Sequence, residues 1–406
     1  MTFRPTVLLL AAAGALCAAP ARVPGRLLVG RSAPLDAAVE SGAWRMHRAV
    51  ERRHVAELGL HVLDVPEESF EAVRASLQRT GLFDYVEPDY YAEQGGSTPN
   101  DSYYGRQWHL PMIGSTNAWT RTTGSASVVI AVVDSGVYAT HPDLAGKLVP
   151  GWNFVKGNAD TSDVTGHGTE VSGAAAAATN NGIGVAGVSW ASVIMPLVTV
   201  DETSYSAYSD IASAIRYAVD HRVRVINVSI GGTSPSTTLQ NAVDYAWNHG
   251  ALVFAAAMNS SVDTPYYPAA CTHAIAVSAT DESDALAVFS NYGSWLTLSA
   301  PGVDILTTMN GGGYGFVNGT SFASPIAAAV ASLVLAENPG LTNQQVLDIL
   351  KESADHIGSN GFDPNFGWGR VNAGRAVQLA SPPPSPAPPV ERQNRFDAGA
   401  AHAGRH

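Results

Sequence analysis

Between residues 101 and 380, short runs of consecutive apolar residues alternate with longer segments whose apolar residues recur at helical spacing. A continuous apolar run indicates a strand buried on both faces, and a spacing of three or four residues indicates a helix with one buried face. The predicted strands are Val128–Val133, Val193–Val198, Val223–Ile230, Leu252–Ala257 and Ala274–Val277. The predicted helices are Ile211–Val219, Leu239–Trp247 and the apolar Pro325–Leu335, and Thr342 with Gln345 predicts a capping box for one more. This alternation predicts an α/β fold with a doubly wound, mostly parallel sheet and helices on both faces.

Residues 22–96 have a different pattern, which predicts a small α+β domain in front of that fold. The predicted strands are Arg26–Val29, the alternating Leu58, Leu60 and Val62, and the alternating Phe83 and Tyr85. A helix is indicated by the spacing of Phe70, Val73 and Leu77, and Gly81 would end it. A domain of this size without a disulfide is marginally stable alone, so a docking partner is expected.

The two ends of the chain differ from the rest in composition. Arg4, the apolar run Thr6–Leu16 and the small residues after it predict a secretory signal peptide over residues 1–21. The run is too short for the ~20 residues of a membrane span, and Cys17 leaves a lipid anchor as an alternative. A linker is predicted at 94–100, and a proline-rich, disordered tail at 381–406. The domains are therefore 1–21, 22–96, 97–380 and 381–406, and a secreted protein is expected, extracellular or periplasmic.

Composition narrows the function classes. With 46% hydrophobic residues, the chain buries a sizeable core and is not disordered throughout. The net charge of −12, carried mostly by residues 97–380, disfavours binding to the negatively charged backbone of nucleic acid. Only two cysteines occur, Cys17 and Cys271, which excludes a disulfide framework.

Three short motifs carry candidate chemistry. Asp134 ends a predicted strand, His167 lies in a Gly-His-Gly-Thr segment, and Ser321 precedes the apolar helix. Taken singly, they are an ordinary turn aspartate, loop histidine and helix-capping serine. Together they are the residue types of nucleophilic catalysis, in which a base takes the serine proton and a carboxylate orients the base. Ligand crevices of open α/β sheets lie at the carboxyl ends of strands, where Asp134 is predicted to be.

In the order Asp-Ser-Gly, His-Gly-Thr and Gly-Thr-Ser-x-Ala-Ser-Pro, these motifs resemble the subtilisin-like serine peptidases. His141–Leu144 and Gly367–Ala373 extend the resemblance over most of the chain. It implies a serine endopeptidase with Asp134, His167 and Ser321 as its triad and Asn259 as the side-chain oxyanion donor. It further implies that residues 22–96 are an inhibitory propeptide, removed by self-cleavage within 91–98. Polypeptide substrates, the propeptide as intramolecular inhibitor, no membrane span and a monomer are expected.

The resemblance also implies where a substrate binds. Ser229, Ile230 and Gly231 would pair their main chain with an extended peptide. Ala256, Ala257 and Met258 would form one wall of the primary specificity pocket, and Tyr266 its floor. The family usually has glycine in place of Met258, and Glu170, Ile326 and Ala328 also depart from its pattern. Because Met258 and Tyr266 fill volume, small or medium aliphatic side chains are expected before the scissile bond.

A structural Ca²⁺ site is implied as well. Its side-chain ligands would be Asp101, Asp143 and Asn181, and its backbone carbonyls those of Thr179, Ile183 and Val185. All are oxygen atoms, which a hard cation prefers. The alternative is an ordinary surface turn beside unrelated acids.

Two other functions remain open. One is a peptide-binding relative that has lost its chemistry, and the other is an esterase or acyl transferase with the same triad. The chain has no Gly-x-Ser-x-Gly motif, which disfavours an α/β-hydrolase esterase. The physiological substrate is not specified by any of these features.

Overall fold

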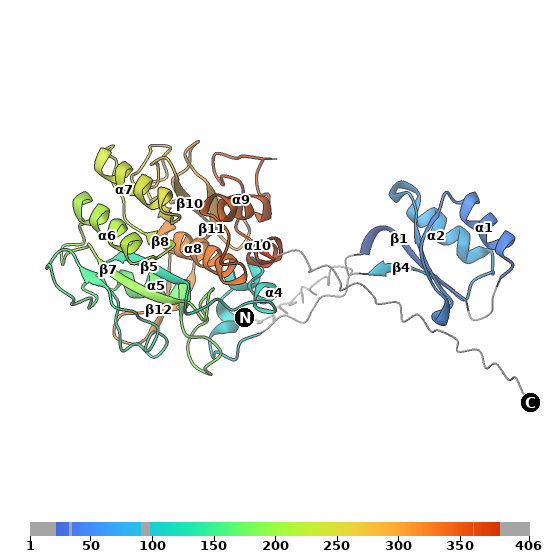
Figure 1. Cartoon of the computed structure of the whole chain (residues 1–406), viewed down its shortest axis with the longest axis horizontal. Coiled ribbons are helices and arrows are strands. Elements are labelled where there is room, and N and C mark those ends of the chain that lie inside the picture. Colours follow the sequence, from blue (N-terminus) through green and yellow to red (C-terminus); the bar gives the residue numbers. More distant parts are fainter. Residues whose placement is uncertain (1–21, 32–34, 91–97, 360, 382–406) are drawn as a thin grey trace, which may run out of the picture. The chain divides into compact units, whose positions relative to one another are not determined.

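The computed structural model describes residues 22–31, 35–90, 98–359 and 361–381 (Figure 1). The chain divides into two compact units, Met1–Gln94 (the N-terminal unit) and Gly95–His406 (the C-terminal unit), each of which is described by itself. The predicted signal peptide, almost all of the predicted cleavage region and the tail beyond Ser381 lie outside the described residues.

The N-terminal unit has two helices packed on a four-stranded antiparallel sheet in the order β2-β3-β1-β4. Its elements are β1 (Arg22–Gly30), α1 (Ala37–Met46), β2 (Val50–Val55), β3 (Leu60–Asp64), α2 (Phe70–Arg79) and β4 (Tyr85–Tyr90). One cluster of buried side chains joins both helices to the sheet, including Leu27, Leu63 and the Phe70, Val73 and Leu77 face of α2. Gly81 follows α2 in the left-handed conformation, as its sequence position predicts.

Three details of this unit differ from the sequence prediction. Phe83 lies in a bend before β4, which begins at Tyr85, so it is not part of the predicted strand. Leu58 is not in a strand: it lies in a 3₁₀ turn, Ala56–Leu58, with 70% of its surface exposed. Helix α1 and strand β2 were not predicted, because their apolar pattern is weak. Trp44 is the buried residue of α1, and the side chains of β2 are exposed or half-buried throughout.

The C-terminal unit is built on a seven-stranded sheet in the order β11-β10-β9-β8-β5-β7-β6, and every neighbouring pair is parallel. Its strands are β5 (Val129–Asp134), β6 (Trp152–Asn153), β7 (Val193–Val198), β8 (Val225–Val228), β9 (Leu252–Ala256), β10 (Ala274–Thr280) and β11 (Leu298–Pro301). A separate hairpin joins β12 (Ile305–Thr308) and β13 (Tyr314–Val317). The predicted α/β fold with a parallel sheet is confirmed; β6 and β11 were missed because they are short.

Helices cover both faces of this sheet (Figure 1). The helices are α3 (His109–Met112), α4 (Ser115–Trp119), α5 (His167–Ala176), α6 (Tyr208–Asp220), α7 (Thr237–Asn248), α8 (Thr320–Glu337), α9 (Asn343–Ser353) and α10 (Ala373–Ala380). Ile130 and Val132 of β5 pack toward α5 and α8, while Ala131 and Val133 pack toward α6 and α7. A strand covered on both sides has no polar face, which explains its unbroken apolar sequence.

Helix α8 runs through the core. It begins at Thr320, five residues before the predicted start, so that Ser321 lies in its first turn. By length and composition it is the one helix among the described residues that could cross a membrane, but 89% of it is buried inside the protein. That burial is the behaviour of a core helix. The capping box of α9, with Thr342 and Gln345, is present as predicted.

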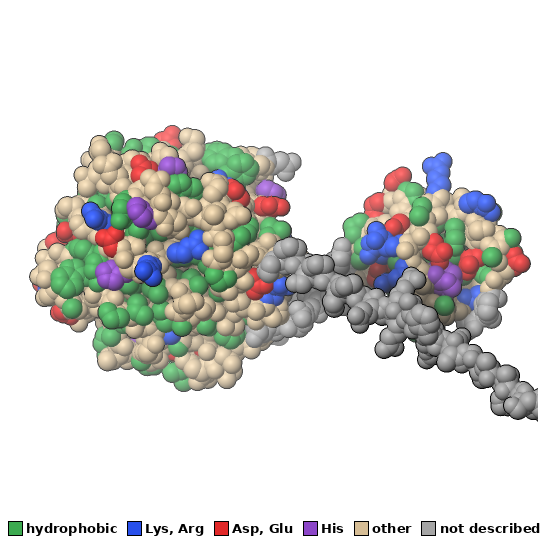
Figure 2. Space-filling model, in the orientation of Figure 1, with side chains coloured by type: hydrophobic (Ala, Val, Ile, Leu, Met, Phe, Trp, Pro, Cys, Tyr) green, Lys and Arg blue, Asp and Glu red, His purple; other side chains and the backbone are tan. Residues whose placement is uncertain are grey.

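The surface of the C-terminal unit carries few charges for its size. On the face shown in Figure 2, Lys and Arg side chains are scattered singly among apolar and uncharged polar groups. The acidity of this unit, predicted from sequence, is therefore not balanced by a concentrated basic patch on that face.

Candidate active site

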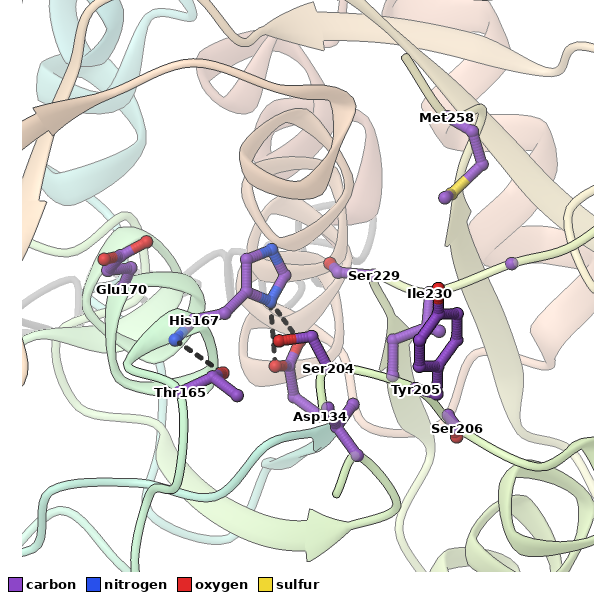
Figure 3. Close-up of a pocket in the computed structure, with 12 residues that line it drawn as sticks. Asp134, Thr165, His167, Glu170, Ser204, Tyr205, Ser206, Ser229, Ile230 and Met258 are labelled. Carbon is purple, nitrogen blue, oxygen red and sulfur yellow. Dashed lines mark hydrogen bonds and ion pairs between the residues drawn. The ribbon is translucent and has the colours of Figure 1, made fainter. Parts of the chain in front are cut away.

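Asp134, which is buried, and His167, which is half-buried, form a pair at the carboxyl end of β5. Asp134 is the last residue of the strand and is fully buried. His167 Nδ1 lies 2.8 Å from Asp134 Oδ1 and 3.0 Å from Oδ2, and the Ser135 amide donates to Oδ1 at 2.8 Å (Figure 3). The carboxylate thus holds the ring by Nδ1 and leaves Nε2 free for chemistry.

A second aspartate fixes the helix that carries His167. Helix α5 begins at His167, and Asp163 accepts hydrogen bonds from the amides of Thr165, Gly166 and Thr169 at its start. The amides of Gly166 and Thr169 are among those that the N-terminus of α5 leaves unpaired, and a carboxylate there also meets the favourable end of the helix dipole. Asp163 was not singled out from sequence, although an aspartate four residues before the histidine is a typical capping signal.

Gly168 allows the His167 segment to approach the Asp134 strand. A Cβ at this position would lie 2.1 Å from the Gly136 carbonyl oxygen and 3.2 Å from Asp134 Cβ. Any side chain would therefore push the two segments apart. Gly319, just before Ser321, is required for a different reason: its φ of +154° is accessible mainly to glycine, while the space around it is ordinary.

Ser321 is held by an unusual helix start. Pro325 has no amide hydrogen, so it cannot donate to the carbonyl of Ser321 one turn earlier. The hydroxyl of Ser229 takes that place, donating to Ser321 O at 2.9 Å.

Two more buried side chains support that contact. Asn227 Nδ2 donates to Ser229 Oγ at 2.9 Å, and Ser324 Oγ donates to Asn227 Oδ1 at 2.7 Å. This buried network ties the end of β8 to the first turn of α8, and so fixes the position of the serine. Asn227 and Ser324 are functional neighbours that the sequence did not reveal, because buried amides and hydroxyls look ordinary there.

The Ser321 hydroxyl belongs to the helix turn whose next residue, Phe322, lies beside the His167 ring. It is directed at Ser229 O, at a donor–acceptor distance of 3.5 Å, and the next residue, Phe322, has its ring centroid 5.8 Å from that of His167. Among the described contacts there is no hydrogen bond between Ser321 and His167. Catalytic hydrogen bonds are often long in proteins without substrate and tighten when it binds.

Asn259 is oriented by the same helix start. Its Oδ1 accepts from the amide and the hydroxyl of Thr320, both at 2.9 Å, which leaves Nδ2 as the free donor. The side chain is exposed and lies one residue beyond the wall residue Met258. An amide that presents its NH₂ beside the Ser321 amide is suited to bind a developing oxyanion.

Met258 adopts a backbone conformation that favours glycine. Its φ is +74°, and it is held there by hydrogen bonds from its amide to Thr320 Oγ1 and from the Asn291 amide to its carbonyl. Such a conformation costs a non-glycine residue roughly 1–2 kcal/mol. Glycine, which the family resemblance leads us to expect at this position, would avoid this cost, and methionine here stores strain next to the site.

A pocket of about 530 Å³ contains much of the predicted site. It is lined by Asp134, Thr165, His167, Glu170, Val200, Ser204, Tyr205, Ser206, Ser229, Ile230, Gly231 and Met258 (Figure 3). The Met258 side chain packs toward Gly231, where an added Cβ would lie 3.4 Å from its sulfur. Ala256 and Ala257 are buried behind this surface, and Tyr266 lies outside the pocket, its hydroxyl 3.0 Å from Ser260 Oγ.

The charges around His167 favour its protonated form. Burial alone would lower the pKa of His167, but the Asp134 carboxylate and its hydrogen bond, with Glu170 and Asp163 nearby, raise it to about 9. Burial also raises the pKa of Glu170, one helical turn from His167. The base is thus strongly basic, and its neutral form dominates only in alkaline solution.

The predicted calcium ligands come together on the same unit, beyond α5. Asp101 and Asp143 are buried, and no Lys or Arg pairs with either among the described residues. Asp101 Oδ1 is buried without a partner, and burial raises the pKa of its carboxyl, with a further contribution from Asp143. Gly184 is needed for this packing, since a Cβ there would lie 2.0 Å from Asp143 Oδ2.

The loop after α5 supplies the remaining ligands. Asn181 Nδ2 donates to Asp143 Oδ1 at 2.9 Å, so a cation would require this amide to turn its oxygen inward. Within the described residues, the carbonyls of Thr179, Ile183 and Val185 accept no hydrogen bond. An orphaned carboxylate oxygen, uncompensated acids and free carbonyls fit a hard cation such as Ca²⁺.

Comparison with known proteins places this geometry in a family. Residues 125–369 match the subtilase family model, Peptidase_S8. The chain is 43% identical over 308 residues to the thermophilic serine proteinase of Bacillus sp. (strain AK1), covering 76% of each. It is 41% identical over 282 residues to thermitase of Thermoactinomyces vulgaris, covering 69% of this chain and 99% of thermitase. A solved Pseudoalteromonas arctica protease superposes with a TM-score of 0.66 at 32% identity, covering 70% of this chain and all of that one.

A serine peptidase on a parallel α/β sheet is the class that this fold and these relatives define. The chain belongs to the subtilase family and is a serine endopeptidase. The family resemblance predicted from the sequence motifs is confirmed.

Proposed function

We propose that this chain is the precursor of a secreted serine endopeptidase that cleaves peptide bonds with Asp134, His167 and Ser321 and processes itself. The observation that carries the proposal is the buried Asp134 carboxylate on His167 Nδ1, beside the helix turn that presents Ser321. A histidine held in this way has its other nitrogen available as a base next to a serine hydroxyl.

The proton moves as follows. His167 Nε2 takes the Ser321 proton as Oγ attacks the peptide carbonyl carbon, and Asp134 stabilises the imidazolium formed. The imidazolium then gives this proton to the leaving amine, which leaves an acyl group on Ser321. A water molecule, deprotonated by His167, hydrolyses the acyl group and restores the serine.

The tetrahedral intermediate carries a negative oxygen that needs donors. Asn259 Nδ2 is left free because Oδ1 is engaged by Thr320. The amide of Ser321 is one of the unpaired donors at the start of α8. We assign these two groups to the oxyanion, because both are fixed before substrate arrives and need no reorganisation.

An extended peptide is the substrate that suits the neighbouring strand end. Within the described part of the chain, the backbone groups of Ile230 and Gly231 form no hydrogen bond, while Gly232 pairs with Tyr267. Free main-chain donors and acceptors at the edge of the pocket support pairing with a substrate strand. The chemistry therefore selects polypeptides by backbone first, and by side-chain pockets second.

Maturation and location extend the proposal to the whole precursor. The N-terminal unit would serve as the inhibitory propeptide, cut within 91–98 by the C-terminal unit. Secretion is supported by the predicted signal peptide and by a relative from Natrialba magadii described as an extracellular serine protease, 37% identical over 386 residues. Asp101, Asp143 and Asn181 would hold a structural Ca²⁺ ion.

The test is the Ser321→Ala variant of the full-length protein, purified without other proteases. It should accumulate as an unprocessed precursor and lose casein hydrolysis, down to roughly the 10³–10⁴-fold acceleration over water that binding and the oxyanion site retain. Mass spectrometry of both proteins reports the termini, and an active-serine phosphonate should label only the parent. Normal maturation of Ser321→Ala would refute self-processing, and unchanged hydrolysis would refute the nucleophile.

A further inference from the structure

Two histidines and two glutamates gather in the N-terminal unit, on elements that meet at one edge of its sheet. His54 of β2 and His61 of β3 are direct cross-strand partners, and their rings stack with centroids 4.1 Å apart. Glu51 of β2 approaches the same place, and the ligating atoms of these three residues all lie within 4.8 Å of one another. Glu40 reaches His61 from helix α1.

His61 is the centre of this group and has a carboxylate on each ring nitrogen. Its Nε2 lies 2.9 Å from Glu40 Oε1, and its Nδ1 lies 2.6 Å from Glu51 Oε1. A neutral imidazole has one N–H donor and one lone pair, so it can satisfy only one of these acceptors. One further proton, or a cation that takes its place, is needed to satisfy Glu51 as well, and His61 is only 5% exposed.

We propose that Glu51, His54 and His61 bind one divalent transition-metal ion of the zinc class. Glu40 would accept the Nε2 proton of His61 and thereby direct the Nδ1 lone pair at the metal, which is the usual partner of a ligating histidine. Imidazole nitrogen with carboxylate oxygen is a donor set for zinc rather than calcium. Water would complete a fourth position.

The distances suit this assignment with little movement. Ligands held at about 2.0–2.1 Å around a tetrahedral ion stand roughly 3.3 Å apart. This lies between the 2.6 Å from His61 Nδ1 to Glu51 Oε1 and the 4.8 Å within which all three ligating atoms lie, so the Glu51 carboxylate would draw back slightly. Glu51 and His54 are exposed, so their side chains can make this adjustment while the buried His61 stays fixed. The metal's two positive charges would balance the two negative charges of the Glu40 and Glu51 carboxylates.

Such an ion would reinforce the weakest part of this unit. Strand β2 is at the edge of the sheet, and its side chains bury little apolar surface. Helix α1 contributes Trp44 to the core. A metal that joins β2 to β3, with α1 behind it, would resist the local opening to which a small domain without disulfides is prone.

The experiment measures zinc binding to the full-length chain in a Ser321→Ala background, with saturating Ca²⁺ to occupy oxygen-only sites. Equilibrium dialysis should give one more bound Zn²⁺ for this parent than for His54→Gln. His47→Gln is the matched control, since His47 lies in the same unit and outside the cluster. Glu40→Gln should retain the site with about 10- to 100-fold weaker affinity, as expected for a residue that orients a ligand.

Measuring the protons released when zinc binds shows whether the metal replaces a proton at His61. Zinc binding to the parent at neutral pH should displace about one proton, measured by calorimetry in buffers of different ionisation enthalpy. When zinc is present and trypsin is added, His54→Gln should also be cleaved more rapidly than the control variant His47→Gln. Equal zinc stoichiometry and affinity for the parent and His54→Gln would overturn the proposal, whatever the outcome for peptidase activity.

Discussion

Asp134 determines the behaviour of His167 more than any other residue. It is buried, this ring is its one basic partner among the described residues, and its charge favours the imidazolium that the proposed mechanism forms. The same charge has a cost for the first step, because the base must start neutral. A strongly basic histidine therefore exchanges activity at neutral pH for stabilisation of the charged intermediate.

The first prediction is an alkaline activity profile. With the pKa of His167 raised to about 9, kcat/KM should rise about tenfold per pH unit through the neutral range and level off above that value. The sign follows from the need for the neutral base, which forms as pH rises. Glu170→Gln removes one of the charges that raise this pKa, so the rising limb should move to lower pH.

Glu352→Gln provides the control, because Glu352 is exposed on α9 and far along the chain from the site. The measurement is kcat/KM from pH 5 to 11 on one peptide, with melting temperatures to exclude unfolding. If kcat/KM instead levels off near pH 6.5, the ordinary histidine pKa, the predicted alkaline profile is wrong. If Glu170→Gln does not move the rise of kcat/KM to lower pH, the predicted effect of the Glu170 charge is wrong.

Met258 combines backbone strain with a role in the pocket wall. Because its φ is +74°, substitution by glycine should relieve backbone strain. Because its side chain lies over Gly231, the same substitution should also enlarge the pocket. We expect the parent to prefer small or medium aliphatic side chains before the scissile bond. Met258→Gly should shift the preference toward phenylalanine by about 10- to 200-fold in kcat/KM.

A peptide series that differs only at that residue tests this expectation. Ala, Val, Leu and Phe peptides should be compared in the parent and in Met258→Gly, with Tyr266→Gly as a second variant. Since Tyr266 lies outside the pocket that Met258 lines, its effect should be the smaller. A parent that cleaves after Phe tenfold better than after Ala would exclude a blocked pocket.

The sequence singled out the proposed catalytic residues but not the residues that position them. Asp134, His167 and Ser321 were recognisable because each lies in a distinctive short motif. Asp163, Thr320 and Asn227 act through capping or buried hydrogen bonds, and such residues are common throughout proteins. Their importance depends on contacts between segments far apart in the chain, which a single sequence does not display.

At the scale of elements, the site depends on how β8 meets α8. Pro325 interrupts the hydrogen bonding of α8 at the Ser321 carbonyl, and Ser229, Asn227 and Ser324 restore it from the side. A helix start that is completed by a neighbouring strand is fixed to that strand. The proposed nucleophile Ser321 and the strand end proposed to bind substrate are thus held in one assembly, as precise positioning requires.

The prediction for this assembly is that Asn227→Ala lowers kcat and leaves KM almost unchanged. Losing the amide removes the acceptor of the Ser324 hydroxyl and the donor to the Ser229 hydroxyl, which keeps only its bond to the Ser321 carbonyl. Such a loss costs about 1–3 kcal/mol in stability. Since a displacement near 1 Å can cost 10²-fold in rate, kcat should fall by about 10- to 100-fold. KM should change little, because Asn227 is fully buried and does not reach substrate.

Asn343→Ala is a matched control for this loss. Asn343 is also nearly buried, and its Nδ2 donates to the Trp247 carbonyl at 2.8 Å, away from the site. It should lose comparable stability with kcat unchanged. Equal kcat values for the two variants would show that the network supports only the fold.

Elements were predictable where burial imposes a strong period. The central strands and α2, α6 and α7 were found because one or both faces are covered. Strands β6 and β11, of two and four residues, are too short to display a pattern. The start of α8 was placed late because Pro325 reads as a helix beginning, although it lies one turn inside.

For the whole molecule, the acidic C-terminal unit raises the question of what balances its buried carboxylates. Asp101 and Asp143 have no basic partner among the described residues, and Asp101 Oδ1 has no hydrogen-bond donor. Burying such groups is unfavourable unless a cation compensates them. Their loop and the adjoining hairpin link segments widely separated in the chain, so a metal there would stabilise the entire unit.

The last prediction is therefore a calcium-dependent melting temperature. Removing Ca²⁺ with a chelator should lower it, since calcium at 100 times its Kd contributes roughly 2.7 kcal/mol. Asp143→Asn should remove most of the difference between calcium and chelator, because it takes one carboxylate from the site. Asp348→Asn, an exposed acid on α9, should retain the full difference. Scans in a Ser321→Ala background avoid self-digestion, and equal melting temperatures with calcium and after complete chelation would exclude the site.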